Sequence, residues 1–204
     1  IRLTFIDRFF QPNGSRLREE ANIQMLAERI ASLGDEQAYK ALFRIFYKPL
    51  SQFAFSIVKS RESAEEIASD VFMNVWKSRE RLLQVDNLRV YLYVSAKNIA
   101  LNYLNKAART QHFSLDELEV DFSVNTATPE QIFISGEMVK RIEAAVNALP
   151  PKRKMIFKLI REDGLKYKEV AQILDISVNT IDVHMAQALR KISEVINLSY
   201  IKSK

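Results

Sequence analysis

The chain has 204 residues, a net charge of +5 at neutral pH and no cysteine. Without cysteine it forms neither disulfides nor thiolate metal sites. No apolar run approaches the roughly 20 residues that a membrane-spanning helix needs, and no signal peptide is recognisable, so we expect a cytoplasmic protein. Only four glycines and five prolines occur, and so few helix-breaking residues favour an all-α fold.

Helical patterns cover most of the first half of the chain, at residues 21–33, 35–60, from about 63, and 88–108. Pro49 lies inside the second pattern and is expected to kink that helix. The third helix is expected to start near Ser63, because Ser63 and Glu66 match a capping box. The polar residues 78–87 are predicted to form a loop before the fourth helix.

The charges alternate along the chain. Residues 87–115 contain no acidic residue, residues 113–139 contain no Lys or Arg, and the chain is basic again from Lys140. Solvated surface explains any single segment at least as well as a binding site does. Two basic blocks around an acidic connector would also suit a polyanion that is bound at two places.

An acidic segment separates two helical regions. Residues 110–132 have no clear helical period and are rich in Ser, Thr and Asn, as is typical of a linker. Further helices are predicted at residues 135–149 and after Pro151, the latter ending by Gly164. We therefore expect two small helical domains, with these boundaries: an unassigned segment at 1–20, a first domain at 21–110, a linker at 111–134 and a second domain at 135–204.

Residues 167–192, YKEVAQILDISVNTIDVHMAQALRKI, contain two amphipathic helical patterns with almost nothing between them. The DIS segment is predicted to be a tight turn in which Ser177 caps the second helix. This is the pattern of a helix-turn-helix, whose second helix can enter the DNA major groove. An ordinary helical hairpin has the same spacing, but basic residues on the preceding helices favour DNA, because phosphate contacts supply much of the affinity.

Three segments together resemble the extracytoplasmic-function (ECF) sigma factors of bacterial RNA polymerase. ESAEEIASDVFMNVWKSRERL and NLRVYLYVSAKNIALNYLNKAAR resemble conserved region two, which grips the polymerase clamp and melts the minus-ten promoter element. LPPKRKMIFKLIREDGLKYKEVAQILDISVNTIDVHMAQALRKI resembles region four, which reads the minus-thirty-five element. The three occur in the order of the family, with the acidic segment at the place of the family's linker.

The resemblance implies three sets of site residues. The polymerase-binding residues would be Glu65, Glu66, Asp70 and Asn74. The minus-ten DNA would be contacted by Arg89, Tyr91, Lys97, Asn98, Asn102 and Lys106. The minus-thirty-five DNA would be contacted by Lys168, Asn179, Thr180, Asp182, Val183, Gln187 and Arg190.

Some residues depart from the family pattern or have a second explanation. Ser63 stands where an acidic residue is frequent, and Asn102 stands where Asp is common, which makes the minus-ten face more cationic. Lys97 and Asn98 replace the pair Arg-Asn, so the charge is kept. Tyr93 is a further stacking candidate beside Tyr91, although core packing accounts for at least one of the two.

The resemblance also implies the partners: core RNA polymerase, through its clamp and flap, promoter DNA, and an anti-sigma factor, which in this family is often membrane-anchored. No small-molecule substrate, cofactor or metal is expected. An enzyme is disfavoured because the two histidines, His112 and His184, are far apart and no catalytic constellation is visible. The alternative function is a helix-turn-helix regulator that binds duplex DNA without being a polymerase subunit.

Overall fold

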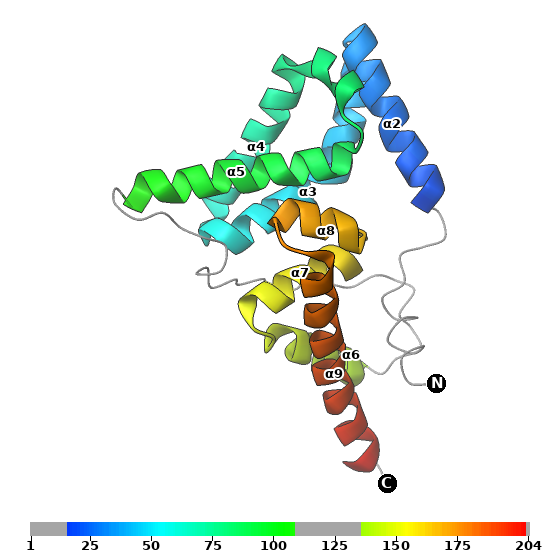
Figure 1. Ribbon diagram of the computed structural model, residues 1–204, viewed down its shortest axis with the longest axis vertical. Helices are drawn as coiled ribbons and strands as arrows, with labels where there is room; N and C mark the ends of the chain where they lie inside the picture. Colours follow the sequence, from blue (N-terminus) through cyan, green and yellow to red (C-terminus); the bar gives the residue numbers. More distant parts are fainter. Residues whose placement is uncertain (1–15, 109–135, 203–204) are drawn as a thin grey trace. The chain divides into compact units, whose positions relative to one another are not determined.

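A computed structural model describes residues 16–108 and 136–202, and every element in those two ranges is helical (Figure 1). The elements are α2 (Arg16–Leu33), α3 (Glu36–Val58), α4 (Arg61–Lys77), the 3-10 helix η1 (Arg79–Gln84), α5 (Leu88–Ala108), α6 (Gly136–Asn147), α7 (Pro151–Arg161), α8 (Tyr167–Leu174) and α9 (Val178–Lys202). The predicted all-α fold is confirmed. The chain forms two compact units, one with α2 to α5 and the other with α6, α7, α8 as far as Ala171, and α9.

Helix α3 is the centre of the first unit and contacts α2, α4 and α5. Its Phe53 is fully buried, and the Phe53 ring lies 5.3 Å from the ring of Tyr93 on α5. Phe72 on α4 is fully buried as well, with its ring 4.8 Å from that of Phe43 on α3. Each large apolar side chain buried in this way contributes about 1.5–3 kcal/mol, so α3 holds both α4 and α5 in place.

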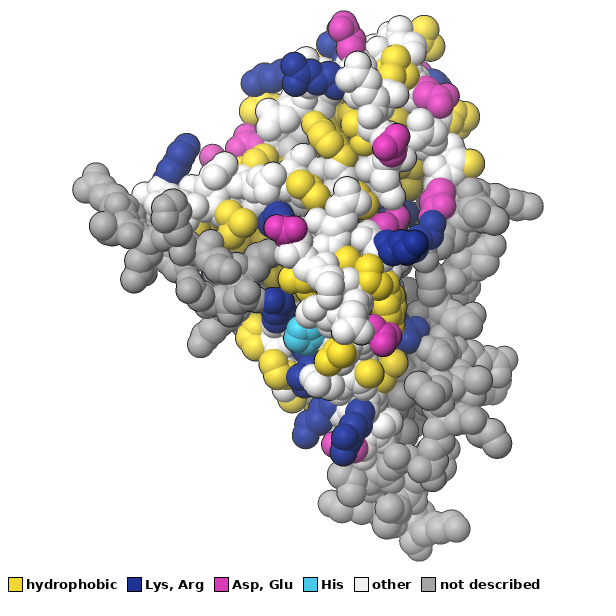
Figure 2. Space-filling model, viewed as in Figure 1, with side chains coloured by type: hydrophobic (Ala, Val, Ile, Leu, Met, Phe, Trp, Pro, Cys, Tyr) yellow, Lys and Arg dark blue, Asp and Glu magenta, His cyan; other side chains and the backbone are white. Residues whose placement is uncertain are grey.

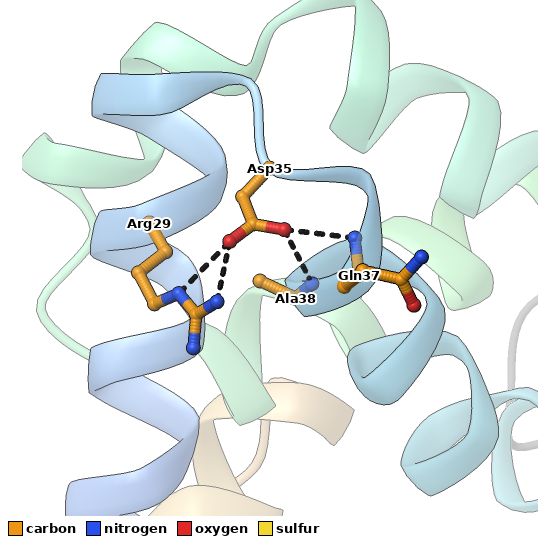
Figure 3. A network of polar contacts seen from close by, with 4 residues as sticks. All are labelled: Arg29, Asp35, Gln37 and Ala38. Carbon is orange, nitrogen blue, oxygen red and sulfur yellow. Dashed lines mark hydrogen bonds and ion pairs between the residues drawn. The ribbon is translucent and has the colours of Figure 1, made fainter.

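The corner between α2 and α3 is held by Asp35 (Figure 3). Gly34 has a φ of 61°, and Asp35 then caps α3, since its carboxylate accepts hydrogen bonds from the backbone N–H groups of Gln37 at 2.8 Å and Ala38 at 3.0 Å. Arg29 on α2 donates to the other carboxylate oxygen at 2.5 and 2.9 Å. The Ala38 N–H and then Arg29 lower the pKa of Asp35 below its usual value.

Three details of the first unit differ from the prediction. Helix α2 begins at Arg16, five residues earlier than expected. The predicted helix at 35–60 is confirmed as α3, with Pro49 inside it. Helix α4 begins at Arg61, and Ser60 caps it by accepting a hydrogen bond from the Ser63 N–H at 3.2 Å, so the predicted cap at Ser63 was wrong. The predicted loop at 78–87 contains η1. The predicted helix at 88–108 is confirmed.

The second unit contains the predicted helix-turn-helix. Helix α8 ends at Leu174 and is capped by Asp175, which has a φ of 57°; the Ile176 N–H donates to the Ala171 carbonyl at 3.0 Å. Ser177 then caps α9 by accepting from the Thr180 N–H at 3.0 Å, as predicted. Helix α9 contacts α6 and α7, and its inward residues are buried: Ile181, Met185, Ala188 and Ile192. The predicted linker at 111–134 lies outside the described residues.

Candidate functional site

Three of the four predicted polymerase-binding residues lie on one surface of α4. Glu66, Asp70 and Asn74 follow one another at four-residue spacing, so their side chains form a line along the helix. We call these three residues the α4 stripe. Glu66 and Asn74 are exposed and Asp70 is half-buried, and none of their side chains pairs with another described residue. They are therefore available to a partner.

Glu65, the fourth predicted residue, is separate from the α4 stripe. One residue turns an α-helix by about 100°, which places Glu65 on the neighbouring flank. There its carboxylate pairs with Arg61 at 2.9 Å. Met73 lies beside the stripe instead, with 51% of its surface exposed. The sequence does not single out Met73, because its exposure depends on how α4 packs.

The apolar side of α4 faces the core. Val71, Phe72 and Val75 are buried there. Trp76 is half-buried, and its ring lies 5.0 Å from the ring of Tyr39 and 5.4 Å from the Arg79 guanidinium. Trp76 is thus already packed within the unit, and it is a weaker candidate for a partner anchor than an exposed tryptophan would be.

Four of the predicted minus-ten residues lie along one side of α5: Tyr91, which is half-buried, and Asn98, Asn102 and Lys106, which are exposed. We call them the α5 stripe. Their spacings of seven and four residues correspond to whole helical turns, within about 40°. None of these side chains pairs with another described residue. Since α5 carries no carboxylate, the stripe offers hydrogen bonds, one ring and positive charge along about 22 Å of helix.

The other predicted minus-ten residues lie elsewhere on α5. Arg89 packs over the Phe46 ring of α3, 5.6 Å from its centroid, so part of its surface is used inside the unit. Lys97 is half-buried and, one residue before Asn98, lies on the flank beside the stripe. Tyr93 is buried against Phe53, so of the two stacking candidates Tyr93 is the core residue.

Two further features near α4 and α5, an exposed leucine and a hydrogen bond between the helices, were not apparent from the sequence. Leu83 on η1 has 57% of its surface exposed, while its neighbour Leu82 is buried. Tyr103 of α5 forms a hydrogen bond with Ser63 of α4, with 2.8 Å between the hydroxyl oxygens. The Tyr103 side chain is partly open to solvent, with 41% of its surface exposed. Its hydroxyl ties the last turns of α5 to the start of α4.

The predicted minus-thirty-five residues on α9 have different surroundings. Asn179, Asp182 and Val183 are exposed in the first turns of α9, where a recognition helix meets base edges. The Thr180 hydroxyl instead lies 2.8 Å from that of Ser177, within the helix cap. Arg190 pairs with Glu194 at 3.3 Å. On α8, Lys168 is exposed.

Gln187 is tied to α7. Arg153 of α7 donates a hydrogen bond from Nη2 to Oε1 of Gln187. His184, one turn earlier on α9, is half-buried, and burial together with the charges of Arg153 and Lys152 lowers the pKa of its imidazole. No local pattern in the sequence relates Arg153 to Gln187, because the two lie 34 residues apart and meet only through the packing of α7 and α9.

Two sigma-factor families match the chain. Residues 42–110 match the family described as Sigma-70 region 2, and residues 140–192 match the family described as Sigma-70, region 4. The ECF RNA polymerase sigma-E factor of Haemophilus influenzae is 26% identical over 88% of this chain and 98% of that protein. The protein of the same name in Escherichia coli K12 is 26% identical over 81% of this chain and 89% of that protein.

Solved structures support the same fold. The sigma factor RpoE from Bartonella quintana, solved with the anti-sigma factor NepR, has a TM-score of 0.54 at 20% identity and covers 78% of this chain and 96% of that chain. CnrH, solved with the cytosolic domain of CnrY, has a TM-score of 0.52 at 19% identity and covers 87% of this chain and 98% of that chain. Within the described ranges, no helix is long and apolar enough to span a membrane, and no acidic, histidine or cysteine cluster could hold a metal ion.

Proposed function

The chain belongs to the ECF sigma factors of bacterial RNA polymerase, and we propose that it initiates transcription by using its two helical units for separate tasks. The unit with α2 to α5 would bind polymerase and open the minus-ten element, and the unit with α6 to α9 would read the minus-thirty-five element. The observation that carries this proposal is that the region 2 and region 4 families match different units of one chain in the order of the family.

The α4 stripe is the proposed contact with the polymerase clamp. Two carboxylates and an amide along one line of the helix would face a basic surface of the partner, and complementary charges speed association and select the partner. The exposed Met73 beside them adds apolar surface of the kind found in the core of a protein interface. Glu65, paired with Arg61 on the next flank, would contribute less than the other three.

The α5 stripe is the proposed contact with the minus-ten element. Unstacked bases gain about 1–3 kcal/mol each by stacking on an aromatic ring, and Tyr91 offers the ring on this stripe. The amides of Asn98 and Asn102 and the charge of Lys106 would hold a strand whose bases have left the duplex, with Lys97 beside them. Melting would then be driven by binding energy. The neighbouring η1, with its exposed Leu83, is the proposed site for an extruded base.

The start of α9 is the proposed reader of the minus-thirty-five element. Asn179 and Val183 lie on its outward side near the capped N-terminus. An asparagine amide can pair with adenine in the major groove, and a valine can contact the methyl group of thymine. Thr180 would act chiefly through the cap that it forms with Ser177, and Lys168 and Arg190 would contact phosphates.

Two further properties follow from this proposal. Core polymerase and the chromosome lie in the bacterial cytoplasm, so the protein would act there. We also propose that an anti-sigma factor holds the chain inactive, as the solved structure of RpoE with NepR illustrates for a protein of the same fold. Membrane anchoring of that partner remains part of the proposal.

Binding of promoter fragments distinguishes this proposal from a regulator without polymerase. The chain alone, core polymerase alone and the mixture would each be incubated with genomic fragments from the encoding organism and separated by native electrophoresis. We expect discrete, heparin-resistant complexes only with the mixture. Tight and sequence-selective binding by the chain alone, unchanged by core polymerase, would favour the regulator instead.

A further inference from the structure

The hydrogen bond between Arg153 and Gln187 determines which way the Gln187 amide faces. An arginine guanidinium carries five N–H donors and no acceptor, so the atom of Gln187 that it contacts must be the carbonyl oxygen Oε1. Neither side chain pairs with any other described residue. The Gln187 amide therefore turns Oε1 towards Arg153 and uses one of its two lone pairs there, while both N–H donors of Nε2 stay available to a ligand.

The pair lies at the surface where two helices pack. Arg153 is half-buried, and its Nε atom is covered by the protein without a hydrogen-bond partner among the described residues. Gln187 is exposed, and Nη2 of Arg153 reaches its Oε1. Helices α7 and α9 contact each other directly, so both side chains project from backbones that the fold holds in place.

The surroundings of Gln187 favour an electron-rich ligand. His184 precedes it by one turn on the same flank of α9, and the charges of Lys152 and Arg153 act on the His184 ring. Figure 2 shows basic side chains beside the histidine on this face. Positive charge here attracts phosphate and the acceptor-rich edge of guanine, and repels groups that present only donors.

We propose that Arg153 is a positioning residue that orients the Gln187 amide so that it contacts DNA chiefly as a hydrogen-bond donor. This rests on the proposed function of α9. A free glutamine recognises adenine through two hydrogen bonds, one accepted by Oε1 and one donated by Nε2. Because Arg153 holds Oε1 and takes one of its two lone pairs, that pairing is weakened. Gln187 then favours a group that accepts: the guanine edge if it reaches a base, or a phosphate oxygen if it reaches the backbone.

The test is a promoter selection with a library randomised across the minus-thirty-five element and complete holoenzyme. Arg153→Met removes the donor but keeps an unbranched side chain, and it should create an adenine preference of at least about fivefold at one position. Arg153→Lys can still donate to Oε1 and should keep the parental preference. In a Gln187→Ala background, Arg153→Met should no longer change any base preference, because its effect passes through Gln187.

Gln187→Glu separates the two possible acceptors. This variant has the same shape and still accepts from Arg153, but its outward atom is an oxygen instead of a donor. If the partner is a base, the selected base should shift from guanine towards cytosine, whose amine donates. If the partner is a phosphate, the consensus should stay unchanged while transcription from all selected promoters falls.

Several outcomes would overturn the proposal. If Arg153→Met lowers thermal stability but leaves the consensus unaltered, the bond is only a tie between helices. If Arg153→Met alters the consensus equally with and without Gln187, Arg153 contacts DNA itself. The parental protein serves as the reference: if it selects no minus-thirty-five motif at all, the proposed function fails, whereas a motif that is insensitive to both residues refutes only the role of Arg153.

Discussion

Reversing the charge of Asp70 should weaken polymerase binding without unfolding the protein. Asp70 lies in the middle of α4. It is therefore outside the first turn, which is the part of the helix where the dipole stabilises a carboxylate most strongly. No described residue pairs with its carboxylate. A surface substitution of this kind changes the free energy of unfolding by about 0.5 kcal/mol or less. Loss of binding would therefore report on the contact and not on the fold.

The size of the effect follows from the exposure of the α4 stripe. Asp70 is half-buried and its neighbours Glu66 and Asn74 are exposed, so a partner charge there would remain partly solvated. Such pairs contribute up to about 1 kcal/mol, and Asp70→Asn should raise the dissociation constant for core polymerase by up to about fivefold. Asp70→Lys replaces the attraction with a repulsion of similar size, which gives about 30-fold.

Fluorescence anisotropy of the labelled chain, titrated with core polymerase at two salt concentrations, measures this effect. The loss should shrink at high salt, because ions screen partly exposed charges. Glu65→Lys is the matched control, since Glu65 lies on the neighbouring flank and pairs with Arg61. The reasoning is refuted if Asp70→Lys binds as tightly as the parent, or if Glu65→Lys weakens binding to the same extent.

Three other variants test separate parts of the account. Lys97→Glu should block open-complex formation but leave polymerase binding intact, and an unchanged permanganate footprint would contradict this. Asp35→Ala removes the cap of α3 and should lower the melting temperature at pH 7. Because the pKa of Asp35 is lowered, the carboxylate stabilises the fold fully above pH about 4, and this stabilisation is lost as the pH falls below that. A difference in melting temperature between parent and variant that persists below pH about 4 would argue against the carboxylate cap. Tyr103→Phe removes the hydrogen bond to Ser63 and should reduce the free energy of unfolding by about 1 kcal/mol, whereas an identical urea midpoint would show that the bond contributes nothing.

The sequence was sufficient for the features that depend on local periodicity. Apolar spacing identified α5 and the helix-turn-helix, and the residue type at position 177 identified the cap of α9. The cap of α4 was misplaced by three residues because Ser60 and Ser63 are both good capping residues, and only Ser60 has the extended backbone that a cap requires.

The composition of each surface could not be read from the sequence in the same way. Glu65 lies beside the α4 stripe and Lys97 beside the α5 stripe. This could be recognised only once the structure showed which faces of α4 and α5 are buried. The bond from Arg153 to Gln187 spans 34 residues and that from Ser63 to Tyr103 spans 40. Such contacts depend on how helices pack against each other, and no local pattern encodes them.

Run-off transcription tests the central claim most directly. The purified chain would be mixed with bacterial core polymerase and genomic promoter fragments, with core polymerase alone as the reference. The account predicts discrete new transcripts that start downstream of a shared minus-thirty-five and minus-ten pair. An absence of new transcripts, with core polymerase that is active with another sigma factor, would contradict it.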